Sequence, residues 1–349
     1  MLRVMSEAAV EAPIPIPFEQ RIFQLSPLGT LGTSFVIFTI LFGSFLVIAT
    51  AEHVSTFMRS GIASGFSNAA WPAMVLSLLC TTALGMQRYA RLAEAKDTAG
   101  YAKILTGGMS SALDVTAIAP SRARLARATL IGLVLGIAIS IAIRLSENRE
   151  GHIIPAGMML WYAAATSLLT VLFVRGVEQS NAGNRSYEIM LHSELKIDLL
   201  RTDTLAVLGR SAFRSALIWF VVSAVACLFF VGGDLNWLTI GLIIACAAMG
   251  LILFVRVMSR IHRQIKGAKD RELEHVRRQI DEVRATLASD AASATRIQGL
   301  LAYEKRIEDA HEWPFDQTTL VRLGASTLIV TMPWFGQAVA GYVIDHLAH

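Results

Sequence analysis

The sequence predicts an all-α integral membrane protein. It has seven transmembrane helices in about three tandem hairpin repeats plus a terminal helix, with a cytoplasmic helical hairpin. Two observations lead to this fold class. The 349 residues are 54% hydrophobic and only 17% charged, with a mean hydropathy of +0.52. The apolar residues also gather in stretches of about 20, enough for a helix to cross roughly 30 Å of hydrocarbon. Soluble domains carry about 25% charged residues, so an ordinary soluble enzyme, a secreted disulfide scaffold and a disordered protein are excluded.

Seven stretches have the length of a membrane span. They lie at 31–51, 69–88, 128–145, 154–174, 215–232, 236–255 and 321–344. The chain divides accordingly into a cytoplasmic Pro-rich segment (1–30), six spans (31–255) with cytoplasmic helical linkers at 89–127 and 175–214, a cytoplasmic hairpin (256–312), and an elbow with the seventh span (313–349). Pro333 and Gly336 interrupt the last span. It is therefore either one kinked helix, which we favour, or a re-entrant hairpin.

The distribution of basic residues predicts the orientation. Of the 31 Lys and Arg residues, all but Arg59, Arg144 and Arg149 fall on the side of the membrane that holds the N-terminus. Cytoplasmic loops carry such an excess, so we expect the N-terminus in the cytoplasm. The net charge of +4 then reflects membrane topology, and no nucleic-acid partner is predicted.

Short similarities indicate an internal repeat. RYARLAE (88–94), VRGVEQ (174–179) and VRVMSR (255–260) each follow the second helix of a predicted hairpin, and WPAM (71–74) matches IPAG (154–157). The copies recur about every 85 residues with the same topology. Parallel repeats of this kind favour helices arranged around an axis along the membrane normal.

The segment 256–312 has the apolar spacing of a helical hairpin. A run at intervals of three and four residues forms a candidate assembly seam of Leu273, Val276, Ile280, Val283 and Leu287. Such spacing places the residues on one face of a helix. The seam can pack on its own chain, which we favour, on other copies in a homo-oligomer, or on a protein partner.

The apolar cores of the seven spans contain no Asp, Glu, Lys, Arg or His. Proton pumps, carboxylate-coupled carriers, voltage sensors and intramembrane metalloproteases need such groups, so these classes are excluded. The chain has no Walker A motif and no GxSxG motif, and its Cys and His residues lack metal-ligand spacing. We therefore expect no enzyme, no catalytic residue, no cofactor and no metal; Cys80, Cys227 and Cys246 are small apolar fillers.

Uncharged polar residues recur at helical spacing along several spans. The candidate conduit-lining residues are Thr39, Ser77, Thr81, Tyr162, Thr166, Thr170, Thr327, Thr331 and Gln337, with Pro333 and Gly336 as a candidate hinge. Hydroxyl groups on such stripes can replace part of an ion's hydration shell. They also permit close helix packing. Gly132 and Gly136 point to packing, which is the favoured interpretation of the stripes alone.

Three segments of the second half resemble a family of uncharacterised bacterial membrane proteins. They are LKIDLLRTDTLAVLGRSAFRSALIW (195–219), EWPFDQTTLVRL (312–323) and MPWFGQAVAGYVID (332–345). The resemblance implies a multi-pass protein of the bacterial inner membrane and a structural role for the elbows. It implies no reaction, ligand or catalytic residue.

Two functions fit these observations. The first is a passive, oligomeric channel-like protein that conducts an ion or small solute. The alternative is a non-conducting membrane scaffold or signalling subunit that recruits a partner through its cytoplasmic helices. The expected partners are the lipid bilayer, further copies of the chain and a cytoplasmic protein.

Overall fold

A computed structural model describes residues 18–57, 66–67, 69–105, 120–149, 155–192, 206–232, 237–286 and 292–310. Within these ranges the helices are α2 (Phe18–Leu25), α3 (Gly29–Ala51), α4 (Ala70–Ile104), α6 (Arg122–Arg149), α7 (Ala156–His192), α8 (Ala206–Ala226), the 3-10 helix η2 (Cys227–Gly232), α9 (Trp237–Thr286) and α10 (Ala292–Glu308). Of these, α3, α4, α6, α7, α8 and α9 are long and apolar enough to cross a membrane. The predicted seventh span, 321–344, lies outside the described residues, and the equivalence of the hairpins as repeats stays a prediction.

Several helices extend beyond the spans assigned from hydropathy. Helix α4 runs to Ile104 and α7 to His192, so part of each predicted linker continues the preceding helix. Helix α8 already begins at Ala206, nine residues before the predicted span. The extensions contain no proline, and their many Ala, Leu, Arg and Glu residues favour continued helix.

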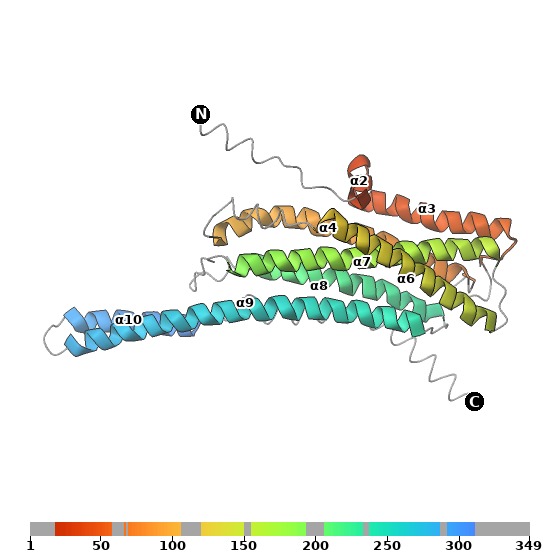
Figure 1. Cartoon of the computed structure of the whole chain (residues 1–349). Helices are drawn as coiled ribbons and strands as arrows, with labels where there is room; N and C mark the ends of the chain where they lie inside the picture. The colour runs from red at the N-terminus through yellow and green to blue at the C-terminus, as the bar shows by residue number, and fades with distance from the viewer. Residues whose placement is uncertain are drawn as a thin grey trace.

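Helix α4 lies at the centre of the bundle and contacts α3, α7 and α8, while α6 packs on α7 and α8 on α9 (Figure 1). In its most apolar window 67% of residues are buried, against 11% in α3 and 17% in α6. Helices α3 and α6 therefore present mostly outward-facing apolar side chains, among them Phe35, Ile40, Leu130 and Val134. Hydrocarbon is the solvent that suits such surfaces.

Aromatic rings fill the core between α3, α4 and α7. Phe45 is fully buried, and its ring centroid lies 5.1 Å from that of Trp161 and 5.8 Å from that of Tyr162. The polar edges of the rings have partners: Trp161 Nε1 donates to Ser44 Oγ at 2.9 Å, and Trp71 Nε1 donates to the Leu228 carbonyl at 2.9 Å. These bonds satisfy indole N–H groups that would otherwise be buried without an acceptor.

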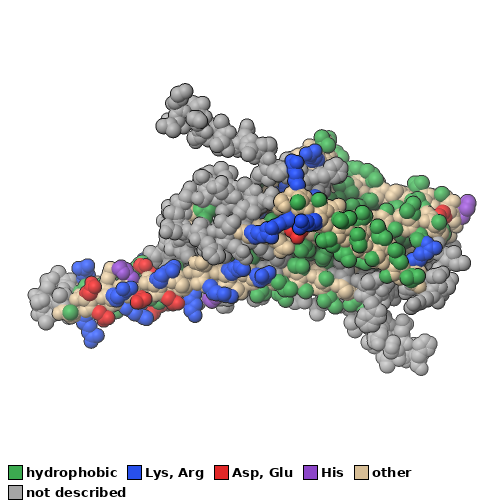
Figure 2. Space-filling model, in the orientation of Figure 1, with side chains coloured by type: hydrophobic (Ala, Val, Ile, Leu, Met, Phe, Trp, Pro, Cys, Tyr) green, Lys and Arg blue, Asp and Glu red, His purple; other side chains and the backbone are tan. Residues whose placement is uncertain are grey.

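Helix α9 continues far beyond the bundle. Its 50 residues span about 75 Å at 1.5 Å per residue, more than twice the thickness of the hydrocarbon layer. Ile261 and Ile265 are buried against Tyr101 and Ile104 of α4 and Leu208 of α8, which holds the base of the projecting part. Beyond this contact α10 returns along α9 (Figure 1). Apolar side chains cover the spans, whereas charged ones gather on the projection (Figure 2).

Candidate functional site

The polar residues of α4 lie inside the bundle. Ser77 is 1% exposed and Thr81 is 6% exposed. The Ser77 hydroxyl donates to the Ala73 carbonyl at 2.8 Å, and the Thr81 hydroxyl donates to the Ser77 carbonyl at 2.8 Å. Each hydroxyl hydrogen is thus used within its own helix, a common arrangement for Ser and Thr in helices.

The polar residues of α7 connect this helix to its neighbours. The Tyr162 hydroxyl donates to the Ala69 carbonyl at the start of α4. Thr170 Oγ1 donates to the Gly132 carbonyl of α6 at 2.8 Å and to the Thr166 carbonyl at 2.9 Å. Thr166 itself is half-buried. These contacts hold helices together in the way that small and hydroxyl-bearing residues do in membranes.

Glycines allow α6 and α7 to meet backbone to backbone. A Cβ atom on Gly132 would lie 2.5 Å from Val171 Cα, and one on Gly136 would lie 2.4 Å from Ser167 Cα. Carbon atoms in van der Waals contact are about 3.5–4.0 Å apart. Only glycine fits either position at this helix separation.

The remaining candidate conduit-lining residues are not brought together with those of α4 and α7. Thr39 is exposed on the outer face of α3, between Phe35 and Ile40, and donates to the Phe35 carbonyl at 2.9 Å. Thr327, Thr331, Pro333, Gly336 and Gln337 lie outside the described residues. Among the candidate conduit-lining residues, Tyr162 and Thr170 bond a neighbouring helix, and a conduit stays a prediction.

An ion pair that the sequence analysis did not identify joins α4 to α8. Arg214 Nη1 lies 2.8 Å from Asp97 Oδ2, and the two side chains are only 12% and 13% exposed. Arg214 Nη2 also donates to Ser211 Oγ at 3.2 Å. A signal was available: Arg214 precedes an apolar span and Asp97 follows another, so both lie at the same end of the bundle.

A second unpredicted contact ties α3 to the opposite end of α7. Glu52 Oε1 accepts from the Gly157 N–H at 2.6 Å, and Oε2 accepts from the Met158 N–H at 3.0 Å. These are orphan donors in the first turn of α7, and the carboxylate also compensates the positive end of the helix dipole. Glu52 lies more than 100 residues from its partners, so no local pattern announces this cap.

The Glu52→Gln variant is expected to lower the stability of the α3–α7 contact by about 1 kcal/mol, and Glu52→Ala by about 2 kcal/mol. Glutamine keeps one acceptor but loses the charge, whereas alanine leaves both donors without their acceptor. Thermal unfolding of the purified protein in detergent, followed by tryptophan fluorescence, measures the order of stability of the unmodified protein and the two variants. A glutamine variant less stable than the alanine variant would contradict the capping role.

The hairpin formed by α9 and α10 places the seam inside its own chain. Val276 and Val283 are buried, Leu273 and Ile280 are half-buried, and Ile307 of α10 is fully buried. Leu287 lies outside the described residues. The seam therefore packs against α10 of the same chain, and the opposite face of α9 stays exposed.

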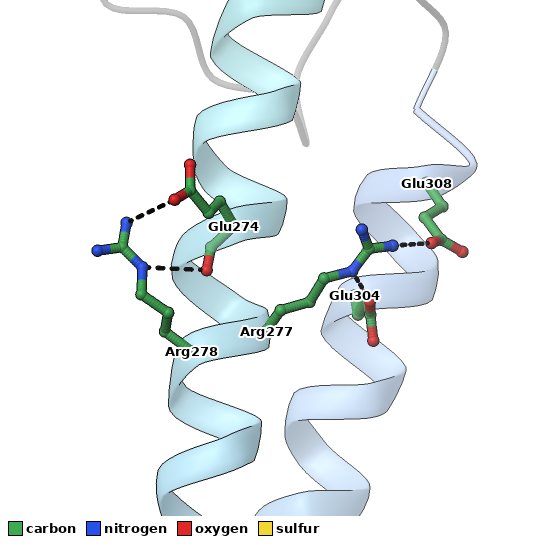
Figure 3. Close-up of polar contacts among 5 residues, drawn as sticks. All are labelled: Glu274, Arg277, Arg278, Glu304 and Glu308. Atoms are coloured by element: carbon green, nitrogen blue, oxygen red, sulfur yellow. Dashed lines mark hydrogen bonds and ion pairs between the residues drawn. The ribbon is translucent and has the colours of Figure 1, made fainter.

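Charged contacts fasten α10 to α9. Arg277 reaches from α9 to both Glu304 and Glu308 of α10, with distances of 2.7 Å from Nε and 3.0 Å from Nη2, whereas Arg278 bonds Glu274 on its own helix (Figure 3). The hydrogen bond and charge of Glu304 raise the pKa of Arg277 above its usual value. Lys269 Nζ also donates to the Glu308 carbonyl at 2.7 Å, near the negative end of α10.

The described part of the chain contains no cluster of candidate metal ligands. No group of three or more His, Cys, Asp or Glu residues there is arranged to hold a metal ion. Cys80, Cys227 and Cys246 are free thiols in buried positions.

Comparison with known proteins adds no relative. No family model matches the sequence, no curated protein matches it, and no solved structure matches the fold. The resemblance of the elbows to uncharacterised bacterial membrane proteins accordingly stays a prediction, and the structure itself is the ground for a functional proposal.

Proposed function

We propose that this protein is a non-conducting membrane scaffold whose spans hold the α9–α10 hairpin at a fixed position for recruitment of a protein partner. The observation that carries the proposal is the continuity of α9. One helix of 50 residues begins within the apolar bundle and ends at the tip of the projection. A continuous helix transmits position without a flexible joint.

The projecting part is held at its base and along its length. At its base, Ile261 and Ile265 pack on α4 and α8. Further out, the seam and the Arg277 contacts keep α10 against α9. The hairpin therefore presents a defined surface, and a partner would bind it without first ordering a loose segment.

The exposed face of α9 in the hairpin carries charges of both signs. Arg271, Glu274, Arg278, Asp281 and Glu282 are exposed there, and Figure 2 shows blue and red side chains interspersed along the projection. A surface of this kind fits a partner with a complementary pattern of charges, since such complementarity determines specificity more than affinity.

The proposal is tested by photo-crosslinking in the cells that make the protein. A photoreactive residue at Arg278 or Asp281 is expected to yield one adduct with the same partner, identified by mass spectrometry. The same residue at Ile244, an exposed position on the apolar part of α9, serves as the matched control and is expected to miss that partner. In the protein with the photoreactive residue at Asp281, reversing the charges of Arg271 and Arg278 should abolish the adduct while the melting temperature is unchanged.

A passive channel formed by several copies is the competing proposal. It rests on the half-buried Thr166, the exposed Thr39 and the predicted span 321–344. The purified chain in liposomes is the decisive comparison. A K⁺, Cl⁻ or glycerol flux that Thr166→Leu reduces, together with no adduct from the hairpin positions, would overturn the scaffold. The absence of flux with a single hairpin partner would support it.

A further inference from the structure

We propose that exposed arginine and lysine side chains at one end of the apolar surface bind anionic phospholipid headgroups. The residues are Arg256, Arg263 and Lys266 of α9 and Arg124 and Arg127 of α6, all exposed. We call them the basic collar. Lipid binding at the basic collar does not depend on the proposed scaffold function.

The α9 part of the collar continues a stripe that faces hydrocarbon. Ile252 is 52% exposed, and Arg256 and Arg263 follow it at intervals of four and eleven residues, which places all three on one side of the helix. The opposite side, with Ile261 and Ile265, is buried against α4 and α8. Tertiary packing therefore prevents α9 from turning its basic face inward.

The same pattern occurs on α6 in the opposite chain direction. Arg124 and Arg127 precede Ile131 and Val134, which are 52% and 58% exposed. Spacings of three, four and seven residues align the four side chains on one face. Two helices that are far apart in sequence thus show the same change from outward apolar side chains to outward arginines.

The position of these charges favours lipid headgroups over a protein partner. Arg263 lies about 10 Å beyond Arg256 along the helix, within about one screening length of the apolar boundary. No Asp or Glu occurs in 256–269 or in 120–145, whereas acidic residues are frequent further out on the hairpin, from Asp270 onward. Guanidinium groups match phosphate geometry, and each basic residue near an anionic surface favours binding about fivefold.

The test uses the full-length protein in mild detergent, mixed with equimolar phosphatidylglycerol and phosphatidylcholine of the same acyl chains. Native mass spectrometry counts each bound lipid. We expect an excess of bound phosphatidylglycerol that falls about threefold or more in the R256Q/R263Q/K266Q variant. The control R271Q/R284Q/R296Q removes the same charge from exposed hairpin positions and should retain the excess.

Two further arms make the result decisive. The excess in the unmodified protein should fall in about 0.5 M NaCl, where charges are screened beyond a few ångströms; this arm needs no variant to fold. Inorganic phosphate should fail to displace the lipid, because it lacks acyl chains that lie along Ile252. Equal binding of both lipids, or equal losses in the two triple variants, would overturn the proposal, as would displacement of the lipid by inorganic phosphate.

Discussion

The Gly136→Leu variant is expected to lose about 3 kcal/mol of unfolding free energy, because α6 cannot keep its present distance from α7. Even the first side-chain carbon at Gly136 would lie 2.4 Å from Ser167 Cα and 2.5 Å from Thr170 Oγ1. The helices would have to separate by more than 1 Å or so to restore carbon contact distances. Separation also breaks the bond from Thr170 to the Gly132 carbonyl. Unfolding in a titration with dodecyl sulfate, followed by tryptophan fluorescence, measures the loss.

A matched glycine on another span controls for the residue type. A Cβ atom on Gly43 of α3 would meet nothing within 4 Å, so Gly43→Ala is expected to leave stability unchanged or raise it by up to about 1 kcal/mol. Gly136→Ala should fall between the control and the leucine variant. Equal stability of Gly136→Leu and the unmodified protein would show that α6 and α7 do not pack at this distance.

The Arg214→Leu variant is expected to be destabilised by about 3–5 kcal/mol, more than Asp97→Asn. Leucine removes the cation from a site that is nearly buried and leaves the Asp97 carboxylate without its partner. Glu94, one turn away on α4, interacts electrostatically with Arg214, Arg91 and Asp97, so the variant keeps two neighbouring carboxylates with one cation fewer. Asp97→Asn is milder because Glu94 remains to compensate the arginine. The same titration with dodecyl sulfate measures both variants.

The double variant Arg214→Leu/Asp97→Leu separates the ion pair from the packing around it. Replacing both partners by apolar residues removes the uncompensated charge, so much of the stability lost in Arg214→Leu should return. Additive losses in the double variant would contradict an interaction between the two side chains. Arg210, which is exposed one turn earlier on α8, supplies the control substitution Arg210→Leu, which is expected to have little effect.

The positions of the spans followed closely from hydropathy, and the contacts between them did not. Each of the six described spans overlaps a stretch assigned from the sequence, because apolar length is a local property that lipid enforces directly. The ends of the helices differed more from the ends of the spans assigned from hydropathy. Helix α4 continues to Ile104 because nothing in its sequence breaks the helix after the apolar part, and hydropathy does not report where helix ends in water.

The seam of the hairpin likewise separates what a local sequence pattern predicts from what contacts between helices decide. Its spacing identified which face of α9 is apolar, since periodicity determines faces. Three occupants were open from that pattern: the same chain, another copy or a partner. The structure places α10 there, with Ile307 fully buried and Arg277 bonded to Glu304 and Glu308. The choice depends on the pairing between α9 and α10, which the pattern of a single helix does not contain.

Composition, apolar length and charge asymmetry are properties of short segments, so the amino acids alone sufficed for an all-α membrane protein with a charged helical extension. The environment of Thr170, the cap that Glu52 supplies to α7 and the pairing of Arg214 with Asp97 depend on how helices distant in sequence are rotated and brought together. A hydroxyl stripe looks the same in sequence whether it faces water or another helix. Only the packed bundle shows that Thr170 meets the backbone of α6. The reason is that contacts between segments supply the free energy that decides whether a stripe faces water or another helix.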